Sequence, residues 1–123
     1  MRTIDNIRRF RLSDTFVEPY KTAQVPWGPL GYITYKRTYS RRLNEFEPGA
    51  AGTEEWWQTC RRVVEGMFNM QKQHVFQLGL DWNDTKAQKT AKDAYDRLFN
   101  LKWTPPGRGL WMMGTKFIEE RTA

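Results

Sequence analysis

A turn near the C-terminus has the clearest potential for chemistry. Its sequence, PPGRGLWMMGT over 105–115, combines two prolines, three glycines and one arginine. The prolines cannot continue a helix, and the glycines on both sides of Arg108 leave backbone amides uncovered. Such amides, together with a guanidinium, can bind phosphate. The turn lacks the spacing of a P-loop or a dinucleotide fingerprint, so the residues alone favour a structural turn that leads into a short buried strand, Leu110 to Met113.

The single cysteine and the single histidine are the other candidates for reactive side chains. Cys60 is followed by Arg61 and Arg62, which would stabilise a thiolate. It also lies on an apolar stripe, where a cysteine usually acts as a small hydrophobic residue, and we expect that role. His74 has no second base or nucleophile near it in sequence, so we expect a surface or capping role.

The adjacent acidic pairs Glu54/Glu55 and Glu119/Glu120 are poorly placed for paired acid–base work. Neighbouring residues on a helix point in diverging directions, so we expect these carboxylates to lie on solvated faces. One histidine and one cysteine cannot form a conventional zinc site. The sequence therefore predicts neither a catalytic constellation nor a metal site.

The stretch from Tyr32 to Arg42 alternates tyrosines with lysine and arginines. This mixture could stack bases and neutralise phosphates. The favoured alternative is an element with its tyrosines inside and its cations outside. The net charge of +6 fits an anionic partner or simply a solubilising surface.

The totals bound the class of protein. A chain of 123 residues suits one domain, and six tryptophans must pack inside it or against another chain. A single cysteine permits no internal disulfide, so we expect a reducing, cytoplasmic setting. No stretch approaches the length of a membrane span, and we expect no membrane partner.

Two helices are predicted from apolar periodicity. The first runs from about 54 to the low 70s, after Thr53 as N-cap and with Gly66 as an interior weakness. Its stripe consists of Trp56, Cys60, Val63, Val64 and Met67. The second follows Asn83 or Asp84 as cap, and its stripe consists of Ala87, Ala91, Ala94, Tyr95, Leu98 and Phe99. The alanines would permit close helix packing.

The remaining elements are short. Ser13 can cap a brief helix that Pro19 strains or ends, and Tyr32 to Tyr35 predict a strand. We therefore expect a mainly α fold with one or two short strands. Its divisions would be a helical region, 1–103, and a turn with a strand, 104–123.

Three blocks carry a resemblance to a known family. They are WGPLGYITYKRTYSR (27–41), RRVVEG (61–66) and PPGRGLWMMGT (105–115), in this order. Together they resemble the N-terminal segment of the adenosylcobalamin-dependent ribonucleoside-triphosphate reductases, the monomeric class II ribonucleotide reductases. The likeness extends from about Ser13 to Thr122 and is densest in these blocks.

The resemblance implies a ten-stranded α/β barrel whose finger loop carries a thiyl-radical cysteine. The family reduces the ribose 2′-hydroxyl of nucleoside triphosphates, with cobalamin generating the radical and a cysteine pair as reductant. This chain would supply only the N-terminal helical region and the approach to the barrel. Cys60 matches no catalytic cysteine of the family.

The resemblance also implies a partner. The chain stops just before the position of the family's first redox cysteine, so we expect an N-terminal subunit or fragment that is inactive alone. A downstream polypeptide would carry the barrel and bind adenosylcobalamin. The alternative is a small basic nucleic-acid-binding module that uses Tyr32 to Arg42.

Within this family likeness, the turn would lie beside the phosphates of the ribonucleoside triphosphate. The amides of Gly109 and Leu110 and the side chain of Arg108 would be the substrate-binding groups. Pro106 departs from the family pattern, which often has a small polar residue there, and so removes potential donors.

Overall fold

The computed structural model describes residues 9–25, 27–105, 110 and 113–115. It contains the helices α1 (Asp14–Val17), α2 (Pro29–Thr38), α3 (Trp56–Gln77) and α4 (Asp84–Phe99), with 3₁₀ turns η2 (Glu18–Lys21) and η3 (Leu43–Glu45). Among these described residues the recorded β pairing is one isolated bridge, Arg42 with Thr53. The expectation of a mainly helical fold is confirmed.

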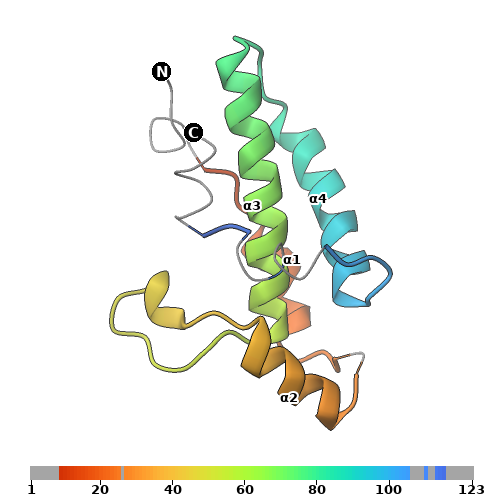
Figure 1. Ribbon diagram of the computed structural model, residues 1–123. Helices are drawn as coiled ribbons and strands as arrows, with labels where there is room; N and C mark the ends of the chain where they lie inside the picture. The colour runs from red at the N-terminus through yellow and green to blue at the C-terminus, as the bar shows by residue number, and fades with distance from the viewer. Residues whose placement is uncertain (1–8, 26, 106–109, 111–112, 116–123) are drawn as a thin grey trace.

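The helices α3 and α4 form an antiparallel pair at the centre of the molecule (Figure 1). Both predicted stripes lie in the interface, with Met67 and Ala94 only half-buried. The buried alanines Ala87 and Ala91 leave room for close packing. The indole Nε1 of Trp56 donates to the carbonyl of Phe99 at 3.0 Å, so the start of α3 is tied to the end of α4.

Local capping explains where these helices begin. Glu55, not the predicted Thr53, is the N-cap of α3, and it forms a capping box with Gln58. Thr53 is used differently, since its hydroxyl and carbonyl accept hydrogen bonds from Lys36. The cap of α4 is Asn83, one of the two predicted candidates, and its side chain accepts from the amide of Lys86 at 3.1 Å.

The predicted strand Tyr32–Tyr35 is wrong, because these residues lie in α2. Pro29 occupies the first turn of α2, where its fixed φ and missing N–H favour a helix start. The helix buries Tyr35 against Trp27 and Trp56, with ring centroids 5.6 and 5.4 Å away. Aromatic packing from another part of the chain thus overrides local strand propensity.

The segment before α2 covers the central pair. Ser13 precedes α1, and Pro19 lies in η2, where the helix tightens and ends as expected. Phe10, Leu12 and Val17 are buried. All five tryptophans that the structure describes are at least half-buried within this chain. The boundary at 104 stays a prediction. Of the predicted strand at 110–113, residues 111 and 112 lie outside the described residues, and the described ends, Leu110 and Met113, are not in a strand.

Candidate functional site

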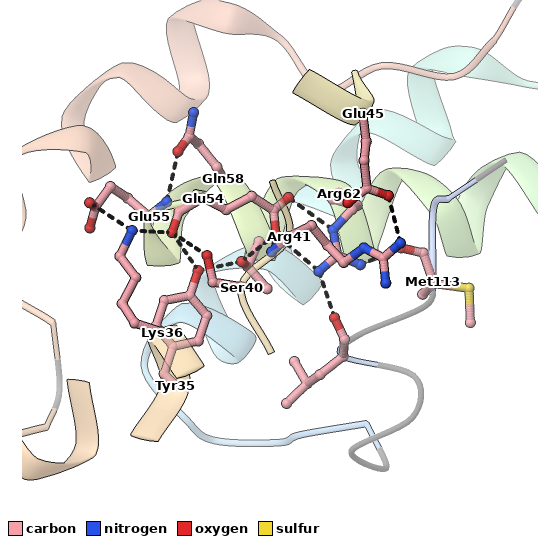
Figure 2. A network of polar contacts seen from close by, with 12 residues as sticks. Tyr35, Lys36, Ser40, Arg41, Glu45, Glu54, Glu55, Gln58, Arg62 and Met113 are labelled. Atoms are coloured by element: carbon pink, nitrogen blue, oxygen red, sulfur yellow. Dashed lines mark hydrogen bonds and ion pairs between the residues drawn. The ribbon is translucent and has the colours of Figure 1, made fainter. Parts of the chain in front are cut away.

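A buried ion pair lies at the start of α3. The Nε of Arg62 contacts Glu54 Oε2 at 2.9 Å, and its Nη2 contacts Oε1 at 3.1 Å (Figure 2). Both side chains are at most 5% exposed. Glu54 Oε1 also accepts from the amide of Arg41 at 3.0 Å and from Thr59 Oγ1 at 2.9 Å. The expectation of a solvated Glu54 is therefore wrong, because four donors replace water around its carboxylate.

The backbone of Glu54 joins this ion pair to α2. Its carbonyl accepts from Lys36 Nζ and Ser40 Oγ, both at 2.7 Å, and from the hydroxyl of Tyr35 at 3.2 Å. Lys36 also pairs with the carboxylate of Glu55 at 3.1 Å. The polar side chains of the first sequence block thus fix the position of Glu54 (Figure 2).

The other side of Arg62 holds the third sequence block. Its Nη2 donates to the carbonyl of Leu110 and its Nη1 to the carbonyl of Met113, each at 2.7 Å. Leu110 directly follows the glycine-rich turn 105–109. We call Glu54, Arg62, Leu110 and Met113 the arginine anchor. It joins the second and third blocks, and the first block contacts it through the amide of Arg41, which donates to Glu54.

The backbones of Gly66 and Gly114 approach each other closely beside the arginine anchor. A Cβ atom built on Gly66 would stand 2.5 Å from the amide nitrogen of Gly114. Gly114 has a φ of +80°, and a Cβ there would stand 2.4 Å from the carbonyl oxygen of Arg62. Gly66 is thus the point where the C-terminal segment touches α3, which explains a glycine that the sequence suggested only as a helix weakness.

The neighbouring Arg61 performs the same task for the N-terminal segment. Its Nη2 donates to the carbonyl of Leu12 at 2.7 Å and to Asp14 at 2.6 Å, and its Nε to Glu65 at 2.9 Å. Glu65 in turn accepts from the amide of Leu12 at 2.7 Å. Adjacent arginines on one helix therefore hold segments from opposite ends of the chain.

An apolar cavity of about 430 Å³ lies beside α2. Its lining includes Trp27, Tyr35 and Trp56, together with Thr104 and Leu110, which flank the turn. Leu110 therefore belongs to the arginine anchor and also lines an aromatic cavity.

The predicted substrate-binding residues are only partly described. Arg108 and Gly109 lie outside the described residues. Leu110 is described, and its carbonyl is held by Arg62. Sequence reasoning missed Glu54, Arg62 and Gly66 as residues that shape this region. The available signal was the block RRVVEG, because its second arginine, Arg62, and its glycine, Gly66, both contact the segment around Leu110 and Gly114.

The two lone reactive residues have the roles that were expected. Cys60 is completely buried, and burial raises the pKa of its thiol well above the usual range, with the charge of Glu54 adding to the shift. His74 is exposed in the last turn of α3. The described part of the chain contains no group of three or more residues suited to hold a metal ion. None of its helices has the length and apolar character needed to cross a membrane.

We expect Cys60 to be unreactive in the folded chain. Its thiol is enclosed by the core and protonated at neutral pH, whereas a disulfide reagent such as DTNB attacks through the thiolate. Native protein should react at least about a hundredfold more slowly than protein unfolded in guanidinium, because reaction requires opening of the core. A rapid stoichiometric reaction of native protein would contradict the buried placement.

The geometry and the sequence define the same class of protein. The profile of the ribonucleotide reductase alpha domain matches residues 12–115, a range that includes all of the arginine anchor, and the chain belongs to this family. Within the family, its relatives are of the B12-dependent, class II kind. A probable adenosylcobalamin-dependent ribonucleoside-triphosphate reductase of Dictyostelium discoideum is 39% identical over 95% of this chain.

Two further comparisons agree. The adenosylcobalamin-dependent ribonucleoside-triphosphate reductase of Euglena gracilis is 37% identical over 92% of this chain. A crystal structure of a B12-dependent class II ribonucleotide reductase matches 88% of the chain with a TM-score of 0.71 and 35% identity, through its N-terminal part. The chain spans about 15% of the length of the two relatives and 14% of the solved chain.

Proposed function

We propose that this chain forms the N-terminal region of an adenosylcobalamin-dependent ribonucleoside-triphosphate reductase and contributes the turn that binds the substrate's phosphates. The main support is the arginine anchor, which fixes the residues that directly follow the turn. The enzyme would convert ribonucleotides to deoxyribonucleotides for DNA synthesis. In this proposal the chain has no catalytic residue of its own.

The phosphate-binding groups in this proposal are the guanidinium of Arg108 and the amides of Gly109 and Leu110. A cationic fork and backbone N–H groups from a glycine-rich turn match the charge and geometry of phosphate oxygens. The hydrogen bond from Arg62 to the carbonyl of Leu110 supports this assignment, because it fixes the backbone of Leu110.

We place adenosylcobalamin in the remainder of the enzyme, where it would supply the radical. The share of the relatives' length that this chain covers, about 15%, supports this placement, because most of such an enzyme would lie in that remainder. The radical cysteine and the reducing cysteine pair would belong to the same remainder.

A second polypeptide, or a continuation of this one, would supply that remainder in a cytoplasmic enzyme. The length of the relatives supports this, because the chain accounts for about 15% of each. The aromatic cavity lined by Thr104 and Leu110 supports it as well, since an open apolar surface is typical of a region that another part of an enzyme covers.

The nucleic-acid-binding alternative receives less support. Tyr35 is buried, Lys36 is bonded to Thr53, Glu54 and Glu55, and Arg41 pairs with Glu45. These groups are engaged within the fold, whereas a nucleic-acid surface would present them to bases and phosphates. We therefore prefer the reductase proposal.

The test is co-expression of the chain with the open reading frame that follows it. The two products should co-elute in size-exclusion chromatography and together reduce a ribonucleoside triphosphate when adenosylcobalamin and a dithiol are supplied. Neither product should be active alone. A pair that neither associates nor reduces nucleotide would refute the proposal. Tight binding of DNA that weakens steeply with salt would then favour the alternative.

Arg108→Ala should raise the KM for the triphosphate substrate about 10- to 100-fold in the active assembly. A hydrogen bond to a charged group is worth about 1.5–3 kcal/mol, which corresponds to that range. Lys102→Ala is the control, because it removes an exposed cation that precedes the turn. If steady-state kinetics show unchanged KM and kcat for Arg108→Ala, this arginine has no role in phosphate binding.

A further inference from the structure

We propose that Arg62 is a positioning residue for substrate binding: it fixes the backbone of Leu110 and Met113, so that the amide of Leu110 is in place before the nucleotide arrives. This inference rests on the proposed function. Arg62 would not touch the substrate, and its influence would pass through the carbonyls of Leu110 and Met113.

The geometry requires an arginine at this position. The guanidinium directs Nε and Nη2 toward Glu54 while Nη1 and Nη2 reach two separate carbonyls. A planar fork with five N–H donors can satisfy these acceptors together. A lysine ammonium has three donors around a single nitrogen and cannot span the same set.

Glu54 makes the fork rigid. Its carboxylate is 3% exposed, and it is itself fixed by the amide of Arg41 and the hydroxyl of Thr59. The guanidinium is therefore oriented from the side of α2 and α3, independently of the turn. Such preorganisation reduces the conformational entropy that substrate binding would otherwise cost.

The contact between Gly66 and Gly114 supports the same conclusion independently. It allows the C-terminal segment to lie against α3 one turn beyond Arg62, at a separation that no side chain would permit. The hydrogen bonds of Arg62 and the bare backbone contact of Gly66 thus hold Leu110, Met113 and Gly114 against one helix. The segment that follows the turn is fixed at both of its ends.

Arg61 provides a matched control. It lies next to Arg62 on α3, also pairs with a glutamate and also donates to a backbone carbonyl, but that carbonyl belongs to Leu12. Substitution of either arginine by lysine should weaken one anchored segment. Only the Arg62 substitution should affect the turn.

The experiment compares Arg62→Lys with Arg61→Lys in the assembled reductase, after wild-type activity has been established. Arg62→Lys should raise the KM for the triphosphate by about tenfold or more and leave kcat within about twofold, the pattern of lost uniform binding. Arg61→Lys should leave both constants near the wild-type values. Hydrogen exchange should show faster exchange at residues 110–115 for the first variant and at residues 9–14 for the second.

A paired substitution separates positioning from stability. Arg62→Met combined with Glu54→Leu replaces the buried charges by apolar side chains, an exchange that often preserves stability. This double variant has no donor for the two carbonyls, so it should show the same rise in KM even when its unfolding midpoint is close to wild type. If Arg62→Lys does not fold, the double variant still tests the positioning role.

The outcomes are distinguishable. An assembly that is inactive with both wild-type arginines would refute the proposed function and with it the role in substrate binding. An active assembly in which Arg62→Lys and the double variant keep the wild-type KM would overturn the positioning role alone. Equal increases in KM for the Arg61 and Arg62 variants would also overturn it, because they would indicate a general loss of structure.

Discussion

Glu54→Ala is expected to destabilise the chain by about 3–5 kcal/mol, the range found when one partner of a buried ion pair is removed. The substitution leaves the guanidinium of Arg62 buried without its carboxylate, and it removes acceptors from Arg41 and Thr59. A loss of this size is a large share of the stability of a small domain. Urea denaturation followed by circular dichroism measures it directly.

Glu45→Ala is the matched control for this result. Glu45 pairs with Arg41 at 2.6 Å, but its side chain is 35% exposed. Exposed pairs contribute about 0–1 kcal/mol, so this variant should remain close to wild type. Similar losses for Glu45 and Glu54 would show that burial does not govern the strength of the network.

Gly66→Ala should lower stability although it replaces a glycine in the middle of a helix. Alanine in a helix interior is favoured over glycine by about 1 kcal/mol, so an isolated α3 would gain stability. Here the new methyl group would stand 2.5 Å from a backbone nitrogen of Gly114. Overpacking of this kind typically costs about 1–3 kcal/mol, and the C-terminal segment must shift away from α3. Thermal unfolding and hydrogen exchange of residues 110–115 test both effects.

A shortened chain tests whether the contact with Gly114 causes the expected loss of stability in Gly66→Ala. In a chain that ends at Pro105, Gly114 is absent, and the same substitution should stabilise rather than destabilise. If Gly66→Ala destabilises the long and the short chain equally, the contact with Gly114 is not the reason. In the assembled enzyme, we expect the shifted segment to weaken substrate binding in the same direction as Arg62→Lys.

Local sequence patterns were sufficient for the two long helices. The stripes on α3 and α4 were predicted because each has a helical repeat and because burial follows that repeat. The cap of α4 was also predictable, since Asn83 acts on an amide three residues away. Features that depend on neighbours in the chain are thus well represented in the sequence.

Features that depend on distant partners were not predictable in this way. Tyr35 has strand propensity, and only its packing against Trp27 and Trp56 explains its place in a helix. Glu54 looks like a surface residue until the donors that surround it are known. Gly66 looks like a defect until Gly114, which lies 48 positions later in the chain, is placed against it.

The family resemblance provided what periodicity could not. It singled out three separated blocks, and the family profile and the relatives confirm the assignment. The structure adds a physical reason for the blocks, since Arg62 of the second block binds the third block and its partner Glu54 is held by residues of the first. Phosphate binding by Arg108, Gly109 and Leu110 stays a prediction.

The arginine anchor also has a consequence for the order in which the protein is built. The carbonyls of Leu110 and Met113 follow Arg62 by 48 and 51 residues. A ribosome that adds about 5–20 residues per second delivers them several seconds after the guanidinium. Both helical stripes are complete once Phe99 has been added, which is 11 residues before Leu110. Glu54, which precedes Arg62 in the chain, is present throughout the interval and can pair with it. Biosynthesis therefore attaches Leu110 and Met113 to a scaffold whose main helices have already been made.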